Sequence, residues 1–154
     1  MRRAVFLDRD GVINKSAPRG EYILSADNIE LMSGIENLIR YFNSLKFLVI
    51  VVTNQQCVGK GLITVSELCE IHNRMFAKLM AGGAIVNDIF YCPHLREDDC
   101  DCRKPNPGML IRAAARHWID LRNSWMIGDS ATDIKAGKRV MCKTILLTDG
   151  ADAE

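Results

Sequence analysis

The chain has 154 residues, of which 48% are hydrophobic and 25% are charged. This composition excludes a disordered or fibrous protein, and the length predicts one domain, residues 1–154. The formal net charge is +1 and Lys and Arg form no long cluster, so we expect neither nucleic acid nor a membrane as a partner.

The beginning of the chain is basic, with Arg2 and Arg3 before the apolar segment 4–7. That segment is too short for the apolar part of a signal peptide. The longest apolar run, residues 47–52, is far below the roughly 20 residues of a membrane-spanning helix. We therefore expect a cytoplasmic protein whose six cysteines are reduced thiols or metal ligands.

Short β-forming runs alternate with helical patterns along the chain. The first predicted helix follows the strand at 4–7, with apolar residues at Ile35, Leu38, Ile39, Phe42 and Leu45. Thr64 and Glu67 form a capping box that begins a second helix, whose buried side we predict to hold Leu68, Cys69, Phe76 and Leu79. Asn106 and Pro107 predict the N-cap and first turn of a third helix that extends through Trp118.

The other predicted strands are residues 47–52, 89–91, 124–127 and 144–147. Strands that alternate with helices indicate a three-layer α/β fold, a Rossmann-like parallel sheet covered on both faces. Ligands of such sheets bind at the carboxyl ends of the strands. Those ends are followed by Asp8, Thr53, Cys92 and Asp129.

Two carboxylates, Asp8 and Asp10, lie two residues apart directly after the first strand. A divalent cation such as Mg²⁺ prefers oxygen ligands and would relieve their mutual repulsion. The alternative for this motif alone is a solvated acidic turn.

Three further segments carry polar groups to the same edge. Thr53 and Asn54 end the second strand, Arg103 and Lys104 precede the third helix, and Asp129 with Asp133 follows the fourth strand. Fixed positive charge just before a helix N-terminus favours the binding of a phosphate group. Taken singly, these segments also fit a strand end, a basic loop and a helix cap provided by Asp129 or Ser130.

Together the four segments resemble the motifs of the haloacid dehalogenase superfamily of phosphohydrolases, in order and over nearly the whole chain. The resemblance implies that Asp8 is the nucleophile and Asp10 the general acid and base, with Thr53, Asn54, Arg103 and Lys104 around the phosphorylated substrate. It also implies Mg²⁺ at Asp8, Asp129 and the main-chain carbonyl of Asp10, with Asp133 behind them.

The cysteines supply a separate signal. Cys92, His94, Cys100 and Cys102 place three thiols and one imidazole within eleven residues, a set typical of a closed, structural Zn²⁺ site. The alternative is a loop of free thiols. We predict that Cys57, Cys69 and Cys142 are small apolar residues, and that His72 and His117 pack on helices or lie at the surface.

The zinc loop, residues 92–102, resembles the branch that contains the heptose bisphosphate and histidinol-phosphate phosphatases. Residues 6–14 and 53–61 resemble the heptose enzymes more closely, although Cys57 and Lys60 replace their usual glycine and arginine. The chain has no room for an inserted cap domain.

We therefore expect a capless, monomeric phosphatase for a small phosphorylated metabolite, first a heptose bisphosphate. Histidinol phosphate is the alternative, and a nucleic-acid 3′-phosphate is a more distant one. A non-enzymatic zinc-stabilised interaction module would explain the cysteines, but it leaves the aspartates and Lys104 without a reason to converge.

Overall fold

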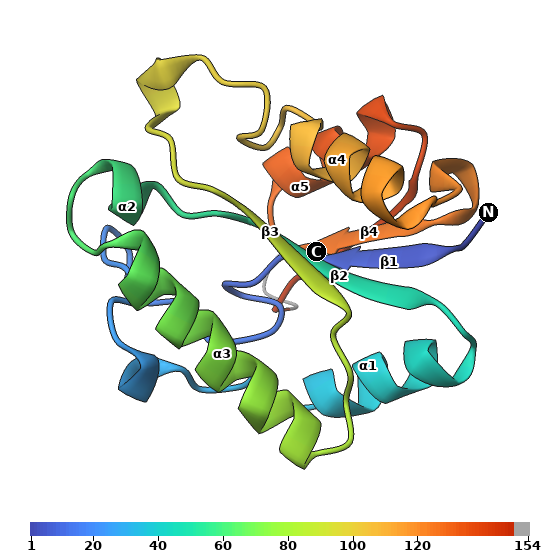
Figure 1. The fold of residues 1–154 in the computed structure, drawn as a ribbon, viewed down its shortest axis with the longest axis horizontal. Coiled ribbons are helices and arrows are strands. Elements are labelled where there is room, and N and C mark those ends of the chain that lie inside the picture. Colours follow the sequence, from blue (N-terminus) through green and yellow to red (C-terminus); the bar gives the residue numbers. More distant parts are fainter. Residues whose placement is uncertain (150–154) are drawn as a thin grey trace.

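The computed structural model describes residues 1–149. Its centre is a parallel sheet of five strands in the order β3-β2-β1-β4-β5 (Figure 1). The strands are β1 (Ala4–Leu7), β2 (Leu48–Asn54), β3 (Asp88–Cys92), β4 (Trp125–Gly128) and β5 (Lys143–Leu146). Each boundary lies within two residues of the predicted one, and the predicted three-layer α/β fold is confirmed.

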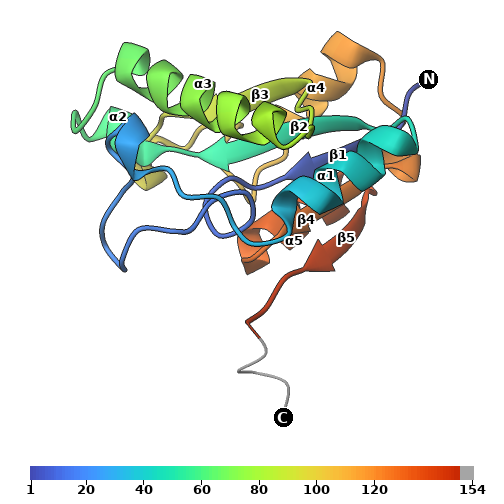
Figure 2. The same ribbon diagram turned by 90° about the horizontal axis from the view of Figure 1, so that it is seen from below.

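Helices cover both faces of the sheet (Figure 2). α1 (Ile35–Ser44) and α3 (Val65–Ala81) lie on one face, and α4 (Gly108–His117) and α5 (Ala131–Arg139) lie on the other. The remaining helices are the short α2 (Gln56–Gly59) and three 3-10 turns, Ala26–Asn28, Arg96–Asp98 and Leu121–Asn123. None of the helices within residues 1–149 has the length and apolar character needed to cross a membrane.

The alternation of side chains in β1 divides the core into two. Val5 and Leu7 pack towards α1 and α3, whereas Ala4 and Phe6 pack towards α4 and α5. All four are fully buried, because successive side chains of a strand point to opposite faces and both faces are covered. This burial on both sides fixes β1, and Asp8 follows it directly at the edge of the sheet.

The predicted helix faces are partly correct. The capping box of Thr64 and Glu67 begins α3, and Leu68 and Leu79 are buried as predicted. Cys69 is exposed, because a side chain one residue after Leu68 is turned about 100° away from the buried stripe. Leu45 lies beyond the end of α1 and is also exposed.

The predicted start of α4 is wrong by one residue. The N-cap is Pro107, and no side chain caps this helix. Asn106 does not cap the helix, because its side chain binds another loop residue: its Nδ2 donates to the carbonyl oxygen of Cys100 at 2.8 Å. At the other end, Trp118 is the left-handed C-cap that follows the last helical residue.

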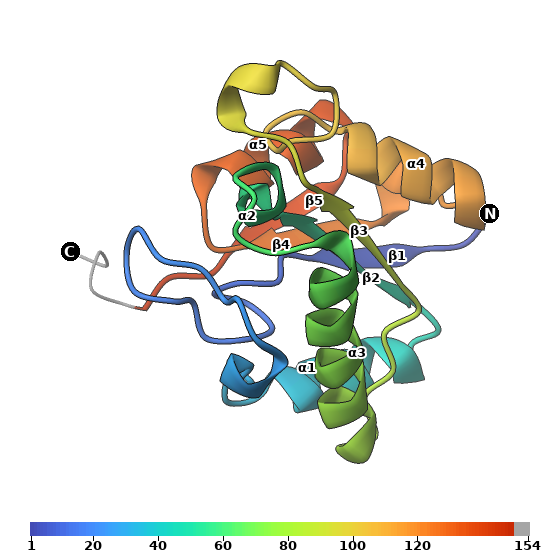
Figure 3. The same ribbon diagram turned by 60° about the vertical axis from the view of Figure 1, so that its left-hand side comes forward.

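The carboxyl ends of β1, β2, β3 and β4 meet at one edge of the sheet. The loops after β1 and β3 and the short α2 gather there, away from the N-terminus of the chain (Figure 3). Asp8 and Asp129, which are 121 positions apart in sequence, are therefore neighbours.

Candidate active site

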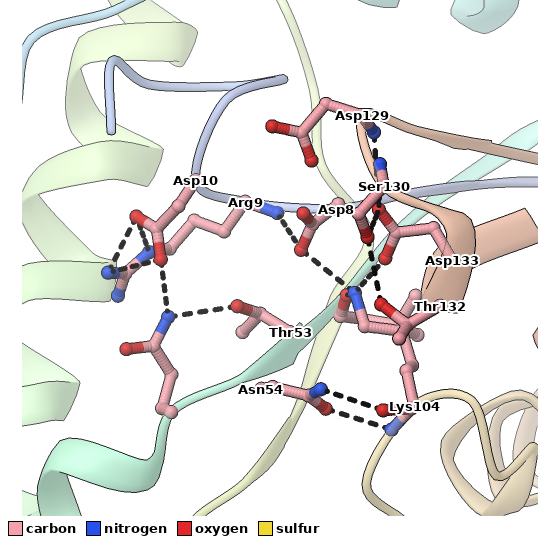
Figure 4. A network of polar contacts seen from close by, with 12 residues as sticks. Asp8, Arg9, Asp10, Thr53, Asn54, Lys104, Asp129, Ser130, Thr132 and Asp133 are labelled. Carbon is pink, nitrogen blue, oxygen red and sulfur yellow. Dashed lines mark hydrogen bonds and ion pairs between the residues drawn. The ribbon is translucent and has the colours of Figure 1, made fainter. Parts of the chain in front are cut away.

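The Lys104 side chain is buried and its ammonium group has three acceptors (Figure 4). Nζ donates to Oδ1 of Asp8 at 2.8 Å and to the carbonyl oxygen of Val52 at 2.7 Å, and it lies 2.7 Å from Oδ1 of Asp133. Burial alone would lower the pKa of Lys104, but the two carboxylates outweigh it and raise that pKa. The site therefore contains a fixed positive charge beside Asp8.

Three carboxylates converge on one side of Lys104. Oxygens of Asp8, Asp129 and Asp133 all lie within 4.8 Å of one another. Burial, together with the nearby Asp133 and Asp129, raises the pKa of Asp8 to about 7, against the lowering influence of Lys104. Burial and Asp133 also raise the pKa of Asp129. A cluster of hard oxygen donors in which like charges lie close together fits a divalent cation such as Mg²⁺.

Asp133 is held by the start of α5. Its Oδ2 accepts from the backbone N–H groups of Asp129 and Ser130, both at 3.2 Å, and from the Ser130 hydroxyl at 2.9 Å. Its other oxygen faces Lys104. Both oxygens of Asp133 are therefore occupied, and the side chain connects the loop that carries Asp129 to Lys104.

Asp10 points away from Asp8, into a set of donors (Figure 4). Oδ1 accepts from Nε and Nη2 of Arg9 at 3.0 and 2.9 Å and from Nδ2 of Asn14 at 3.0 Å. Oδ2 accepts from Nε2 of Gln55 at 2.9 Å, and the same amide donates to Oγ1 of Thr53 at 2.9 Å. One amide thus couples Asp10 to the predicted phosphate-binding Thr53.

Asn54 and Arg103 lie next to Lys104. The Asn54 amide exchanges two hydrogen bonds with the Lys104 main chain, at 3.1 and 3.0 Å, so it fixes the loop that delivers the lysine. Nη1 of Arg103 is buried without a hydrogen-bond partner. Arg103 also lines a cavity of about 250 Å³ together with Asp10 and Gln56.

Sequence reasoning missed the buried polar residues behind Asp10. Arg9 is fully buried, and Asn14, Gln55 and His72 are 0 to 3% exposed. His72 is one of the two helical histidines predicted to pack or to lie at the surface, and its contact with Arg9 is polar. Its helical spacing with Leu68, Met75 and Leu79 is the signal that could have placed it in the buried stripe of α3.

The predicted zinc ligands form one cluster at the end of β3. The Sγ of Cys92 lies 3.0 Å from that of Cys102 and 3.6 Å from that of Cys100, and His94 Nδ1 lies 3.2 to 3.4 Å from two of the sulfurs. Tetrahedral Zn²⁺ with bonds of about 2.3 Å separates its sulfurs by about 3.8 Å. The three thiols are free of disulfides, so the donor set fits Zn²⁺. Arg103 and Lys104 follow this cluster directly.

Known proteins with similar sequences and structures agree with this geometry. Residues 101–154 match the HAD-hydrolase-like family model. The D-glycero-beta-D-manno-heptose-1,7-bisphosphate 7-phosphatase of Pseudomonas aeruginosa is 37% identical over 150 residues, which cover 97% of this chain and 83% of the relative. The chain belongs to this family of HAD-like phosphatases.

Other members of the family support the assignment. The D-glycero-alpha-D-manno-heptose-1,7-bisphosphate 7-phosphatase of Campylobacter jejuni is 34% identical over 147 residues, covering 96% of this chain and 83% of the relative. The D,D-heptose 1,7-bisphosphate phosphatase of B. bronchiseptica, solved with magnesium and phosphate, has a TM-score of 0.87 and 34% identity over 94% of this chain and 79% of that one. Family membership makes the chain a hydrolase of phosphoric monoesters.

Proposed function

We propose that the chain removes the 7-phosphate of D-glycero-D-manno-heptose 1,7-bisphosphate through an aspartyl-phosphate formed on Asp8. The observation that carries the mechanism is the placement of Asp8 between Lys104, 2.8 Å away, and the carboxylates of Asp129 and Asp133. The substrate is supported by the names of relatives that are 34 to 37% identical over most of the chain.

In the first step, a carboxylate oxygen of Asp8 attacks the phosphorus atom and the bond from phosphorus to the sugar oxygen breaks. Asp10 gives its proton to that oxygen, which leaves as an alcohol. Lys104 and the hydroxyl of Thr53 bind the phosphoryl oxygens and neutralise their charge.

In the second step, water attacks the phosphorus atom of the aspartyl-phosphate. Asp10 takes a proton from the water, the bond between phosphorus and the Asp8 oxygen breaks, and inorganic phosphate leaves with Asp8 restored as a carboxylate. Because one residue serves first as acid and then as base, its position relative to the phosphorus atom matters in both steps.

Mg²⁺ would be held by Asp8, Asp129 and the main-chain carbonyl of Asp10, with Asp133 behind them. When bound, it supplies positive charge that stabilises the negative charge of the transferring group. Zn²⁺ would be held by Cys92, His94, Cys100 and Cys102, where four protein ligands leave no open position for chemistry. Its role would be structural, because it would order the loop that delivers Arg103 and Lys104.

The cavity beside Asp10 supports a substrate with a second polar end. Arg103 lines that cavity and its Nη1 is buried without a hydrogen-bond partner, and Tyr22 and Gln56 on the wall are joined by a hydrogen bond of 2.8 Å. A guanidinium binds phosphate and sugar hydroxyls with paired hydrogen bonds, so we assign Arg103 to the sugar or to its 1-phosphate.

A phosphate-release assay tests the proposal. It compares both anomers of heptose 1,7-bisphosphate with fructose 1,6-bisphosphate and histidinol phosphate, each with Mg²⁺ and with chelator. We expect the highest kcat/KM for a heptose bisphosphate and no turnover in chelator. A higher kcat/KM for histidinol phosphate would make that compound the preferred substrate. Full activity in chelator would show that the reaction does not need Mg²⁺.

A further inference from the structure

Behind the proposed acid and base lies a buried contact between two basic residues from distant segments. Nη1 of Arg9, which follows the nucleophile, lies 3.1 Å from Nε2 of His72 in the middle of α3. Arg9 is fully buried and His72 is 3% exposed, so bulk water cannot take the place of either hydrogen-bond partner. This contact needs an explanation, because two basic side chains repel each other when both are charged.

The chemistry of the pair fixes the state of the histidine. An arginine side chain has donors only, so Nε2 of His72 must be the acceptor and the imidazole must be neutral. Burial and the neighbouring Arg9 lower the pKa of His72 to about 3, in agreement with this assignment. His72 is therefore an acceptor for Arg9 and carries no charge in the working range of pH.

The same guanidinium holds Asp10 along its other edge. Nε and Nη2 of Arg9 contact Oδ1 of Asp10 at 3.0 and 2.9 Å, and Nη2 also contacts Oδ2 at 3.1 Å. If His72 were absent, Nη1 would lack this acceptor in a fully buried position. Buried donors rarely stay unpaired, so the guanidinium would turn and its paired contact with Asp10 would be lost.

We propose that His72 is a positioning residue for the phosphatase reaction, which acts on Asp10 through the Arg9 guanidinium. The proposal rests on the role of Asp10 as acid and base given under the proposed function. His72 touches neither the phosphoryl site nor the metal cluster in the contacts of residues 1–149, so its effect must pass through Arg9. Gln55 and Asn14 also donate to Asp10, at Oδ2 and Oδ1 respectively, and neither of these restraints passes through His72.

The test compares His72→Leu, which removes the acceptor, with His72→Gln, whose side-chain oxygen can still accept from Arg9. His117→Gln is the matched control, because His117 lies on α4 and pairs with Asp88 at 2.6 Å. Folding of each variant is checked by circular dichroism and by zinc content. The readout is the single-turnover rate at which the aspartyl-phosphate forms, measured by rapid acid quench.

Two substrates separate positioning from general damage. The p-nitrophenolate group leaves without a proton, whereas the alkoxide of β-glycerophosphate needs the proton of Asp10. We expect His72→Leu to form the intermediate from p-nitrophenyl phosphate within about twofold of the wild-type rate. From β-glycerophosphate it should be slower by about 10-fold or more, the scale of losses from outer-shell partners of a catalytic group. His72→Gln should recover most of that loss, and His117→Gln should show none.

A double variant tests whether the effect passes through Arg9. In an Arg9→Met background, His72→Leu should cause no further slowing with β-glycerophosphate, because the connecting group is already gone. Independent, multiplicative losses would overturn the proposed route through the guanidinium.

Three other results would also overturn the proposal. They are equal slowing with both esters, no slowing with either, and equal loss in the Leu and Gln variants. These results are distinct from failure of the proposed substrate, since both test esters are simple phosphates. If the wild-type protein does not hydrolyse heptose bisphosphate but forms the aspartyl-phosphate from the test esters, the comparison still tests the role of His72.

Discussion

Gly11 lies so close to Asp129 that a Cβ atom at position 11 would stand 1.9 Å from Oδ2 of the aspartate. Gly11 also has a φ of +86°, a backbone conformation that residues with a Cβ rarely adopt. The loop after β1 can therefore approach the carboxylate cluster only because position 11 has no side chain.

We predict that Gly11→Ala lowers Mg²⁺-dependent turnover by about 100-fold, the scale expected when a reacting group shifts by about 1 Å. The added methyl group must push Asp129 out of the carboxylate cluster. Gly20→Ala is the control, because Gly20 has a φ of +85° and nothing within 4 Å of the added Cβ. Both variants should lose similar stability, about 1 to 2 kcal/mol from the backbone. Equal activity losses in the two variants would show that strain, and not the contact with Asp129, is responsible.

We predict one tightly bound Zn²⁺ per chain, whose removal costs stability as well as activity. Cys100→Ala/Cys102→Ala should lower the melting temperature by roughly 10 °C, because the loop they order has little apolar core. Turnover should fall as well, since Lys104 follows Cys102 by two residues. Cys69→Ala, which changes an exposed cysteine outside the loop, should leave both unchanged. Elemental analysis of protein purified without added metal, with no zinc found, would contradict the prediction.

The arrangement of the main site could be predicted because it depends on rules of parallel sheets. Asp8, Thr53 and Asp129 each end or follow a strand, and parallel strands bring those ends to one edge whatever the exact strand boundaries are. The predicted boundaries were displaced by up to two residues without affecting this result. The cluster of Cys92, His94, Cys100 and Cys102 could be predicted because these residues are close in sequence.

The support of Asp10 could not be predicted, because it joins segments whose pairing no local pattern specifies. Arg9 and His72 are 63 residues apart, and each resembles an ordinary surface or packing residue on its own. Only packing of α3 against the loop after β1 brings them together. The role of Asn106 was mistaken for a similar reason, since its amide contacts Cys100 and Arg139 in preference to the helix that follows.

We predict that Mg²⁺ stabilises the protein more at pH 8 than at pH 5.5. The pKa of Asp8 is raised from 3.8 to about 7, so the folded protein keeps a proton there that the unfolded chain releases. The contribution of this group to stability therefore falls as pH rises from about 4 to 7. A bound cation favours the ionised carboxylate and removes that loss.

The measurement is the rise in melting temperature on adding MgCl₂ to protein that retains its zinc, at the two pH values. Asp8→Asn is the control, because an amide does not titrate and the difference between the two pH values should shrink. A Mg²⁺ effect that is equal at both pH values in the wild-type protein would contradict the assigned titration.

We predict different losses for the two aspartates of the first motif, although they are two residues apart. Asp8→Asn should abolish turnover, because an amide cannot attack phosphorus and is a poor ligand for Mg²⁺. Asp10→Asn keeps the nucleophile and the main-chain carbonyl, so it should lose only proton transfer, worth about 10²- to 10⁴-fold. The loss in forming the aspartyl-phosphate should be smaller for an aryl phosphate.

In Asp10→Asn the aspartyl-phosphate should accumulate, since the attacking water has lost its base. Rapid acid quench with labelled aryl phosphate, followed by peptide mapping, locates the label. The amide in Asp10→Asn keeps one acceptor oxygen for the donors Asn14 and Gln55 and loses the charge that pairs with the buried Arg9, so the melting temperature should fall. Label on any residue other than Asp8, or full activity of Asp8→Asn, would refute covalent catalysis at this position.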